Sequence, residues 1–140
     1  MEALYTAEAL STGGGRDGHV RTVDGRLDTD MAAPKEMGGS GAGLNPELLF
    51  AAGYAACFNS ALHAVARKEG TALRDVSVGS RVSIGANDAG GYQLQVVLEI
   101  NVPGLDHEAA VRLINDADQL CPYSNALRGN VDITLDIVDE

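Results

Sequence analysis

The sequence predicts an α+β protein in which largely antiparallel sheet packs around one long, central, apolar helix. The helix is predicted over residues 45–70, which form the longest apolar run in the chain. Two later segments, residues 76–84 and 92–102, alternate apolar and polar residues and predict the clearest strands. Strands and helices do not alternate regularly along the chain, and this order favours the α+β class. At 140 residues the chain is expected to form a single domain, residues 1–140.

Ahead of the helix, three short strands are predicted over residues 5–11, 19–23 and 26–31. A run of three glycines at residues 13–15 predicts a turn or bulge after the first strand. The pair Asp24-Gly25 is typical of tight hairpin turns and predicts a hairpin between the second and third strands. Residues 32–44 are rich in glycine and poor in large side chains, so we expect a mobile loop there.

Both ends of the long helix are marked in the sequence. Asn45 is a favourable N-cap, Pro46 fits the first helical position, and Glu47 lies where the helix dipole favours a carboxylate. At the other end, Gly70 can adopt the left-handed conformation that ends a helix. Nearly the whole circumference is apolar or small, so we expect burial against a sheet and a partner subunit. The unbroken apolar span is too short, and its flanks too polar, for a transmembrane helix.

After this helix, residues 85–91 carry turn residues and predict an antiparallel hairpin of the two clearest strands. Asp106 is a candidate N-cap for a second, amphipathic helix. Pro122 is expected to break that helix and to start about one further turn, which Gly129 ends. Residues 131–138 alternate again and predict a final strand.

The chain carries 10 basic and 20 acidic residues, a formal net charge of −10. This charge argues against nucleic acid or an anionic membrane as a partner. The N-terminal residues show no secretory signal, so we expect a cytoplasmic protein. Two cysteines in that compartment are typical of free thiols or of a redox pair, and with three scattered histidines they form no zinc pattern, so no metal is expected.

The cysteines are the candidate reactive groups. Cys57 lies about three turns into the long helix. Gly53, one turn earlier, costs about 1 kcal/mol relative to alanine and indicates a close approach of another group. On this helix alone, the simpler interpretation of Cys57 is a small buried hydrophobe. Cys121 directly precedes Pro122, where unpaired backbone N–H groups could stabilise a thiolate. Together the two cysteines are consistent with a dithiol and disulfide couple.

Two charged residues could act on a sulfur atom. Taken alone, Arg16 is typical of a solvated turn and Glu47 of a first-turn helix acid. Together they could form a bidentate ion pair that aims a fixed positive charge at a thiol. None of the histidines is assigned a catalytic role, because His63 lies six residues after Cys57 and faces the other side of the helix.

Three motifs resemble one known family. GGGRDGHV spans residues 13–20, LNPELLFAAGYAACFNSAL residues 44–62, and CPYSNALRGNV residues 121–131. Across essentially the whole chain, the sequence resembles the organic hydroperoxide resistance proteins of the Ohr/OsmC family. Tyr123, which follows the second cysteine and its proline, is similar to the Ohr branch and not the OsmC branch.

The resemblance implies an OsmC-like fold, an intertwined homodimer and a thiol peroxidase without haem or metal. It implies that Cys57 attacks the peroxide and becomes a sulfenic acid, and that Cys121 resolves it as an intramolecular disulfide. Arg16 would stabilise the Cys57 thiolate, and Glu47 would orient Arg16. No cofactor is expected to be bound. The implied reductant is a dihydrolipoyl group on a lipoylated protein, and the implied substrates are bulky organic and fatty-acid hydroperoxides. A candidate substrate pocket is lined by Phe50, Gly53, Tyr54, Phe58 and Tyr123.

Helix geometry adds an expectation about assembly. On an unbroken helix, Glu47 and Cys57 are about 15 Å apart along the axis and about 80° apart around it. A dimer with paired long helices would bring Arg16 and Glu47 of one chain to the cysteines of the other. A bend at Gly53 or Pro46 would instead allow the site to form within one chain.

Other functions remain open at this point. Within the same fold, an osmotically induced relative would take hydrogen peroxide as readily as organic peroxides. A small redox sensor would pass the oxidation of Cys57 to a partner protein. A structural protein with incidental cysteines would lose little beyond stability on Cys57→Ser.

Overall fold

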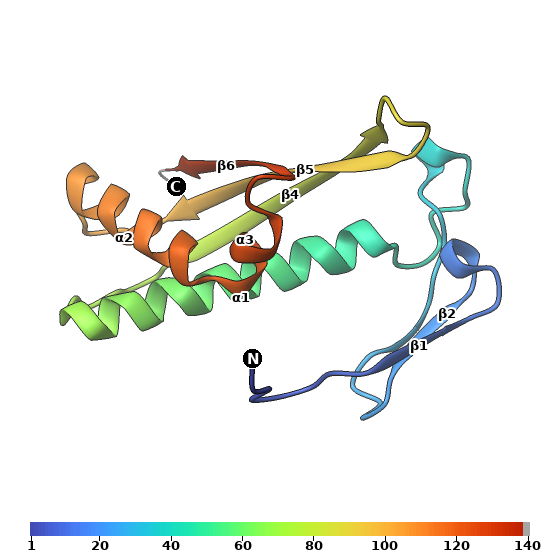
Figure 1. The fold of residues 1–140 in the computed structure, drawn as a ribbon, viewed down its shortest axis with the longest axis horizontal. Helices are drawn as coiled ribbons and strands as arrows, with labels where there is room; N and C mark the ends of the chain where they lie inside the picture. The colour runs from blue at the N-terminus through green and yellow to red at the C-terminus, as the bar shows by residue number, and fades with distance from the viewer. Residues whose placement is uncertain (139–140) are drawn as a thin grey trace. The chain divides into compact units, whose positions relative to one another are not determined.

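The computed structural model describes residues 1–138, which belong to two compact units, residues 1–49 and the residues from 50 onward. In chain order the elements are β1 (Ala9–Thr12), η1 (Gly15–Asp17), β2 (His19–Thr22), β3 (Asp28–Asp30), η2 (Lys35–Met37), α1 (Pro46–Glu69), β4 (Ser77–Ala86), β5 (Tyr92–Asn101), α2 (His107–Leu120), α3 (Pro122–Leu127) and β6 (Asp132–Ile137) (Figure 1). Helix α1 begins in the first unit and continues into the second. The predicted α+β class is confirmed.

The first unit contains an antiparallel sheet with the strand order β1-β2-β3. The predicted hairpin is present, and Gly25 in its turn has a φ of 75°. The first strand begins at Ala9 and not at residue 5, because pairing between β1 and β2 ends where Ala9 faces Thr22. Tyr5 lies outside the sheet and is 80% exposed.

The predicted loop at residues 32–44 contains the short 3₁₀ helix η2 and is tied to the sheet at its ends. Met31 and Leu44 form an isolated bridge, and the Ala32 N–H donates to the Leu44 carbonyl over 2.8 Å. At Gly39 a Cβ atom would collide with the Ala33 carbonyl, so the glycine is needed where the loop folds closely on itself. Movement of this loop stays a prediction.

Helix α1 has the ends that its sequence predicts. The Leu48 N–H donates to Asn45 Oδ1 over 2.8 Å, which is N-cap geometry. At the C-terminal end Gly70 has a φ of 76°, and the Thr71 N–H donates to the Ala66 carbonyl over 2.9 Å. By length and composition α1 also meets the criteria for a membrane span, a test that core helices of soluble proteins pass too. Its 18-residue window has a mean hydropathy of 1.4, and 22% of it is buried within the chain.

The sheet of the second unit has the order β4-β5-β6. β4 and β5 form the predicted antiparallel hairpin, whereas β6 runs parallel to β5, with Leu98 beside Leu135. The expectation of largely antiparallel sheet therefore holds with one parallel pair. The pair arises because α2 and α3 carry the chain back along the sheet before β6 begins.

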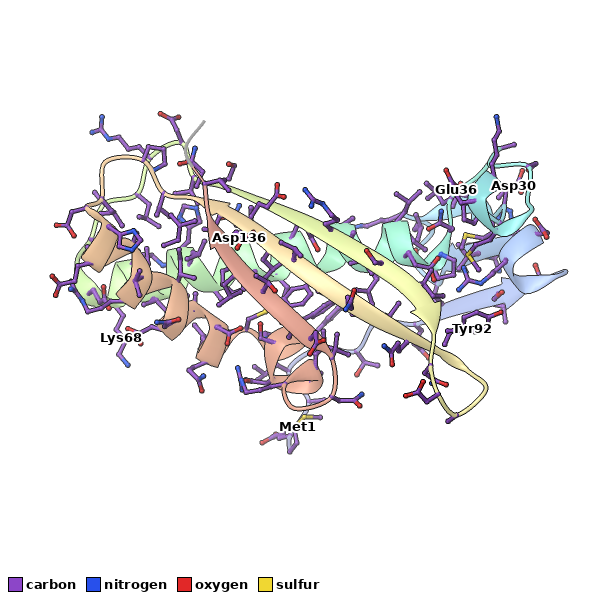
Figure 2. All side chains as sticks on the ribbon, turned by 90° about the horizontal axis from the view of Figure 1, so that it is seen from above. Met1, Asp30, Glu36, Lys68, Tyr92 and Asp136 are labelled. Carbon is purple, nitrogen blue, oxygen red and sulfur yellow. The ribbon has the colours of Figure 1, made fainter. Side chains whose placement is uncertain are left out.

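The core of the second unit joins this sheet to its helices, and Figure 2, which views the sheet from above, shows the sheet lying over α1. Alternate residues of β5 point into it and are almost fully buried: Val96, Leu98 and Ile100. They belong to one apolar cluster with buried residues of α1 and α2, among them Phe58, Leu62 and Leu113. As predicted, α2 is capped by Asp106, whose carboxylate accepts from the Ala109 N–H over 2.8 Å. Its packed apolar stripe carries the Cys121 end of α2 onto α1.

Candidate functional site

The structure brings the two cysteines together. The Cys57 and Cys121 Sγ atoms are 3.6 Å apart, and both are free thiols. A disulfide bond measures about 2.05 Å, so only a small movement separates this arrangement from a covalent link. Cys121 is fully buried, whereas Cys57 is only partly buried. The pair therefore has one sulfur that solutes can reach and one that they cannot.

Cys121 reaches this position because two helices meet at it. It is the C-cap of α2, with its N–H donating to the Ala117 carbonyl, and also the N-cap of α3. Pro122 disfavours helical geometry in the residue before it, and Cys121 has the extended values φ −64° and ψ 120°. The sequence-based prediction of a break at Pro122 is confirmed. The chain changes direction at Cys121, which directs its side chain at α1.

The Cys57 thiol has its pKa raised above its usual value, and burial is the largest cause. A hydrogen bond from the Tyr123 backbone N–H to this sulfur acts in the opposite direction, while the neighbouring Cys121 raises the pKa further. Sequence reasoning expected N–H groups near Pro122 to serve the sulfur of Cys121. The Tyr123 N–H instead donates to the Cys57 sulfur, where it favours the thiolate, the nucleophilic form of a cysteine.

Arg16 and Glu47 form the bidentate pair that was predicted. Arg16 Nη1 donates to Glu47 Oε2 over 2.8 Å, and Nη2 donates to Oε1 over 2.7 Å. The Glu47 side chain is 14% exposed and that of Arg16 35% exposed. The guanidinium lowers the pKa of the Glu47 carboxyl. Both residues belong to the first unit, so the pair presents a fixed guanidinium at the start of α1.

The glycine-rich motif sets the position of Arg16. Arg16 lies in η1, the single turn between β1 and β2. At Gly18 a Cβ atom would collide with the Thr12 carbonyl, so the turn closes only around a glycine. The Asp17 carboxylate then accepts from the Ala33 N–H over 3.2 Å and ties the turn to the loop that leads into α1. These contacts explain the two residues that follow Arg16 in the motif, Asp17 and Gly18.

Three aromatic side chains of the second unit, Phe50, Tyr54 and Tyr123, pack against one another. The Tyr123 ring lies 6.0 Å from Phe50 and 5.7 Å from Tyr54, measured between ring centroids. At Gly53 a Cβ atom would be 2.9 Å from the Tyr123 hydroxyl oxygen. The predicted close approach at this glycine is therefore confirmed, and the approaching group is the Tyr123 side chain. The ring reaches α1 only because Gly53 has no side chain.

The other pocket candidates lie deeper. Tyr54 and Phe58 are both 0% exposed and belong to the core cluster. The Tyr54 hydroxyl is 2.6 Å from Ser124 Oγ, and Ser124 is also 0% exposed. Sequence reasoning missed Ser124, although it lies inside the CPYSNA motif. The available signal was a hydroxyl in the first turn of the short predicted helix, three residues after Cys121.

His19 is paired with acidic residues of its own sheet. His19 on β2 is paired through its two ring nitrogens with Asp28 and Asp30 of β3, and these carboxylates raise its pKa. Within residues 1–138, no group of three or more histidine, cysteine or acidic side chains is arranged to hold a metal ion. The reactive side chains that the structure brings together in the second unit are the two thiols, Cys57 and Cys121.

Comparison with known proteins identifies the family of this chain. The family described as OsmC-like protein matches residues 38–136. The chain belongs to the OsmC-like protein family. Among curated members, the organic hydroperoxide resistance protein of Xanthomonas axonopodis pv. citri is 49% identical over 136 residues, covering 96% of this chain and 94% of that protein. The resemblance to organic hydroperoxide resistance proteins is confirmed.

Solved structures of the family are equally similar. The organic hydroperoxide resistance protein of Legionella pneumophila superposes with a TM-score of 0.95 at 49% identity, covering 99% of this chain and 100% of that one. A putative organic hydroperoxide resistance protein of Vibrio cholerae gives a TM-score of 0.93 at 45% identity, covering 98% and 94%, and holds captopril in one of its active sites. The OsmC-like fold is thereby confirmed.

Proposed function

We propose that this chain is a cysteine-based peroxidase that protects cells by reducing organic hydroperoxides, including those of fatty acids, to alcohols. The observation that carries the proposal is the pair of free thiols 3.6 Å apart, one accessible and one buried. The relatives named as organic hydroperoxide resistance proteins support the same role. The accessible thiol of such a pair is suited to meet a peroxide, and the buried one to close a disulfide.

The proposed reaction begins at Cys57. Its thiolate attacks the distal peroxide oxygen, the O–O bond breaks, and the alkoxide leaves and takes a proton to become the alcohol. Cys57 is left as a sulfenic acid. The Cys121 sulfur then attacks the Cys57 sulfur, the S–O bond breaks, and water leaves as the disulfide forms. Each cycle consumes one peroxide and stores two oxidising equivalents in the Cys57–Cys121 bond.

A dithiol must then reduce this bond, and we propose that dihydrolipoyl groups of a lipoylated protein do so. Cys121 is fully buried even in the single chain, so the incoming thiolate attacks Cys57 and expels Cys121. The second thiol of the reductant closes its own disulfide and releases Cys57. No bound cofactor is part of the proposal. The chain is expected to work in the cytoplasm, where thiols stay reduced.

We propose that Arg16 stabilises the thiolate of the reactive cysteine in a partner subunit. Burial raises the pKa of the Cys57 thiol, so a nearby cation is needed to favour the thiolate. Glu47, the partner of Arg16, precedes Cys57 by ten residues, or about 15 Å along a helix. Two chains whose α1 helices pair would bring each guanidinium to the other chain's thiol. They would also cover the apolar window of α1, of which 22% is buried within the chain.

Sedimentation at working concentration tests this assembly. A homodimer is expected, and a monomer that retains full peroxidase activity would contradict the exchange of Arg16 between subunits. Mixing Arg16→Ala chains with Cys57→Ser chains sharpens the test. Each parent is expected to be weak or inactive, whereas mixed dimers contain one site with both residues intact and should recover part of the activity.

Peroxide consumption with dihydrolipoamide tests the reaction itself. Cumene hydroperoxide and hydrogen peroxide are compared as substrates for the wild type and for Cys57→Ser. Preference for the organic peroxide, lost in the variant, is the expected result. Equal use of both peroxides would favour the osmotically induced type of relative. Absence of turnover with any dithiol, despite oxidation of Cys57, would contradict the peroxidase and favour a redox sensor.

A further inference from the structure

We propose that Tyr54 and Ser124 are positioning residues for disulfide closure, and that their buried hydrogen bond holds Cys121 against Cys57. The inference rests on the proposed function, because closure is its second step. The Tyr54 hydroxyl and Ser124 Oγ are 2.6 Å apart, and both residues are 0% exposed. A buried hydroxyl without a partner is costly, so two hydroxyls that meet in the core specify one arrangement of their helices.

The bond lies one helical turn from the sulfur pair on both sides. Tyr54 precedes Cys57 by three residues on α1, so their side chains lie on neighbouring positions of one helix face. Ser124 follows Cys121 by three residues and lies in the first turn of α3. The hydrogen bond and the 3.6 Å thiol contact therefore join the same two segments at adjacent points. A shift of α3 along α1 would disturb both.

Disulfide closure requires the segment from Cys121 to Ser124 to be held close to α1. The two sulfur atoms must move from 3.6 Å to about 2.05 Å while the Cys121 sulfur attacks the Cys57 sulfenic sulfur. In that step the S–S bond forms, the S–O bond breaks, and hydroxide leaves and is protonated to water. On the α2 side, the Arg128 guanidinium holds the junction of α2 and α3 by donating to the Asp118 carbonyl and to Asn125 Oδ1, each over 2.8 Å. The hydrogen bond between Tyr54 and Ser124 links α3 to α1.

The protonation states are compatible with this role. Burial raises the pKa of Tyr54 above its usual value, so its hydroxyl keeps its proton at neutral pH. Each hydroxyl can then donate or accept, and the bond can persist as the sulfur atoms change charge during the cycle.

The test separates the two chemical steps. Tyr54→Phe and Ser124→Ala each remove one hydroxyl, and single-turnover rapid quench with cumene hydroperoxide follows the sulfenic acid, trapped with dimedone, and the disulfide, measured by mass. Each variant is expected to close the disulfide about tenfold more slowly, the effect of losing one buried hydrogen bond. The sulfenic acid should accumulate accordingly. The double variant should be no slower than the slower single variant, because both changes break the same bond.

Ser80→Ala is the matched control. Ser80 is a serine of the same unit whose buried Oγ has no hydrogen-bond partner within the described residues. Its removal should leave the rate of closure unchanged. If Ser124→Ala does not fold, Tyr54→Phe, which keeps the aromatic ring, carries the test. Ser124→Thr, which keeps a hydroxyl, should close its disulfide faster than Ser124→Ala.

A wild-type rate of closure in both hydroxyl variants, with only a lower melting temperature, would overturn the inference and leave the pair purely structural. Diamide distinguishes this outcome from failure of the proposed function. Diamide accepts the two electrons and two protons of the thiols, and the Cys121 sulfur displaces its adduct on Cys57 without any peroxide. A wild type that ignores peroxides but closes with diamide would contradict the peroxidase. The closure rates of the variants with diamide would still decide the role of Tyr54 and Ser124.

Discussion

The Cys57 and Cys121 sulfur atoms lie 3.6 Å apart although 64 residues separate them in the chain. One sulfur is on the middle of α1 and the other is at the junction of α2 and α3. They differ in burial, since Cys57 is partly exposed and Cys121 is fully buried, and the proposed mechanism gives them different roles on this basis.

Cys121→Ser should consume about one equivalent of peroxide per chain and then stop, because the Cys57 sulfenic acid has no thiol partner. Further peroxide should convert Cys57 to the sulfinic acid, which mass spectrometry detects. Cys57→Ser is the control and should consume none. Sustained turnover of Cys121→Ser with dihydrolipoamide would remove Cys121 from the mechanism.

If Arg16 acts on Cys57 of a partner subunit as proposed, Arg16→Ala should slow peroxide attack at pH 7 by about five- to tenfold, because loss of the cation would raise the pKa of Cys57 and leave less thiolate. The pH profile of alkylation by iodoacetamide should move to higher pH. Arg16→Lys keeps the charge but not the bidentate pairing with Glu47. Its rate of peroxide attack should therefore lie between those of the wild type and Arg16→Ala. An alkylation profile that is the same in all three proteins would argue against the role of Arg16.

Glu47→Gln should destabilise the protein by roughly 1 to 2 kcal/mol at pH 7, because the Arg16 guanidinium loses its charged partner. The pKa of Glu47 is lowered in the folded chain from its ordinary value of 4.5. Its contribution is therefore complete above that value and is lost as the pH falls through the lower folded pKa. Denaturant unfolding at pH 7 and at acidic pH measures the free energy of unfolding of both proteins. The difference in this free energy between wild type and variant should become smaller at acidic pH.

The control for this experiment is Glu69→Gln, which changes an exposed carboxylate at the other end of α1. If the difference in free energy of unfolding between Glu47→Gln and wild type stays constant down to strongly acidic pH, the ion pair is not the cause of that difference.

Gly53→Ala should destabilise the protein by about 1 to 3 kcal/mol, since the new methyl group would lie 2.9 Å from the Tyr123 hydroxyl oxygen. This cost exceeds the gain of about 1 kcal/mol that alanine brings to a helix interior. Thermal or denaturant unfolding measures the balance. Adding Tyr123→Phe removes the oxygen and should recover most of the loss, and a double variant as unstable as the single one would place the strain elsewhere.

Local chemistry alone predicted much of the fold. The cap at Asn45, the helix end at Gly70, the turn at Asp24-Gly25 and the cap at Asp106 were all correct. Such signals act through backbone dihedral angles and hydrogen bonds within about four residues. The first strand was predicted four residues too early at its N-terminal end, because its start depends on the length of β2, which no residue of β1 encodes.

The candidate site divides in the same way. The sequence by itself determined that Cys57 lies on an apolar helix, that Gly53 admits a close neighbour, and which family the motifs resemble. Only the tertiary structure decided that this neighbour is Tyr123, that the Tyr123 N–H serves Cys57, and that Ser124 meets Tyr54 in the core. These contacts join residues about 70 positions apart. They exist because α2 buries its apolar stripe against α1 and β5. No local sequence pattern specifies the relative position in which two such surfaces pack.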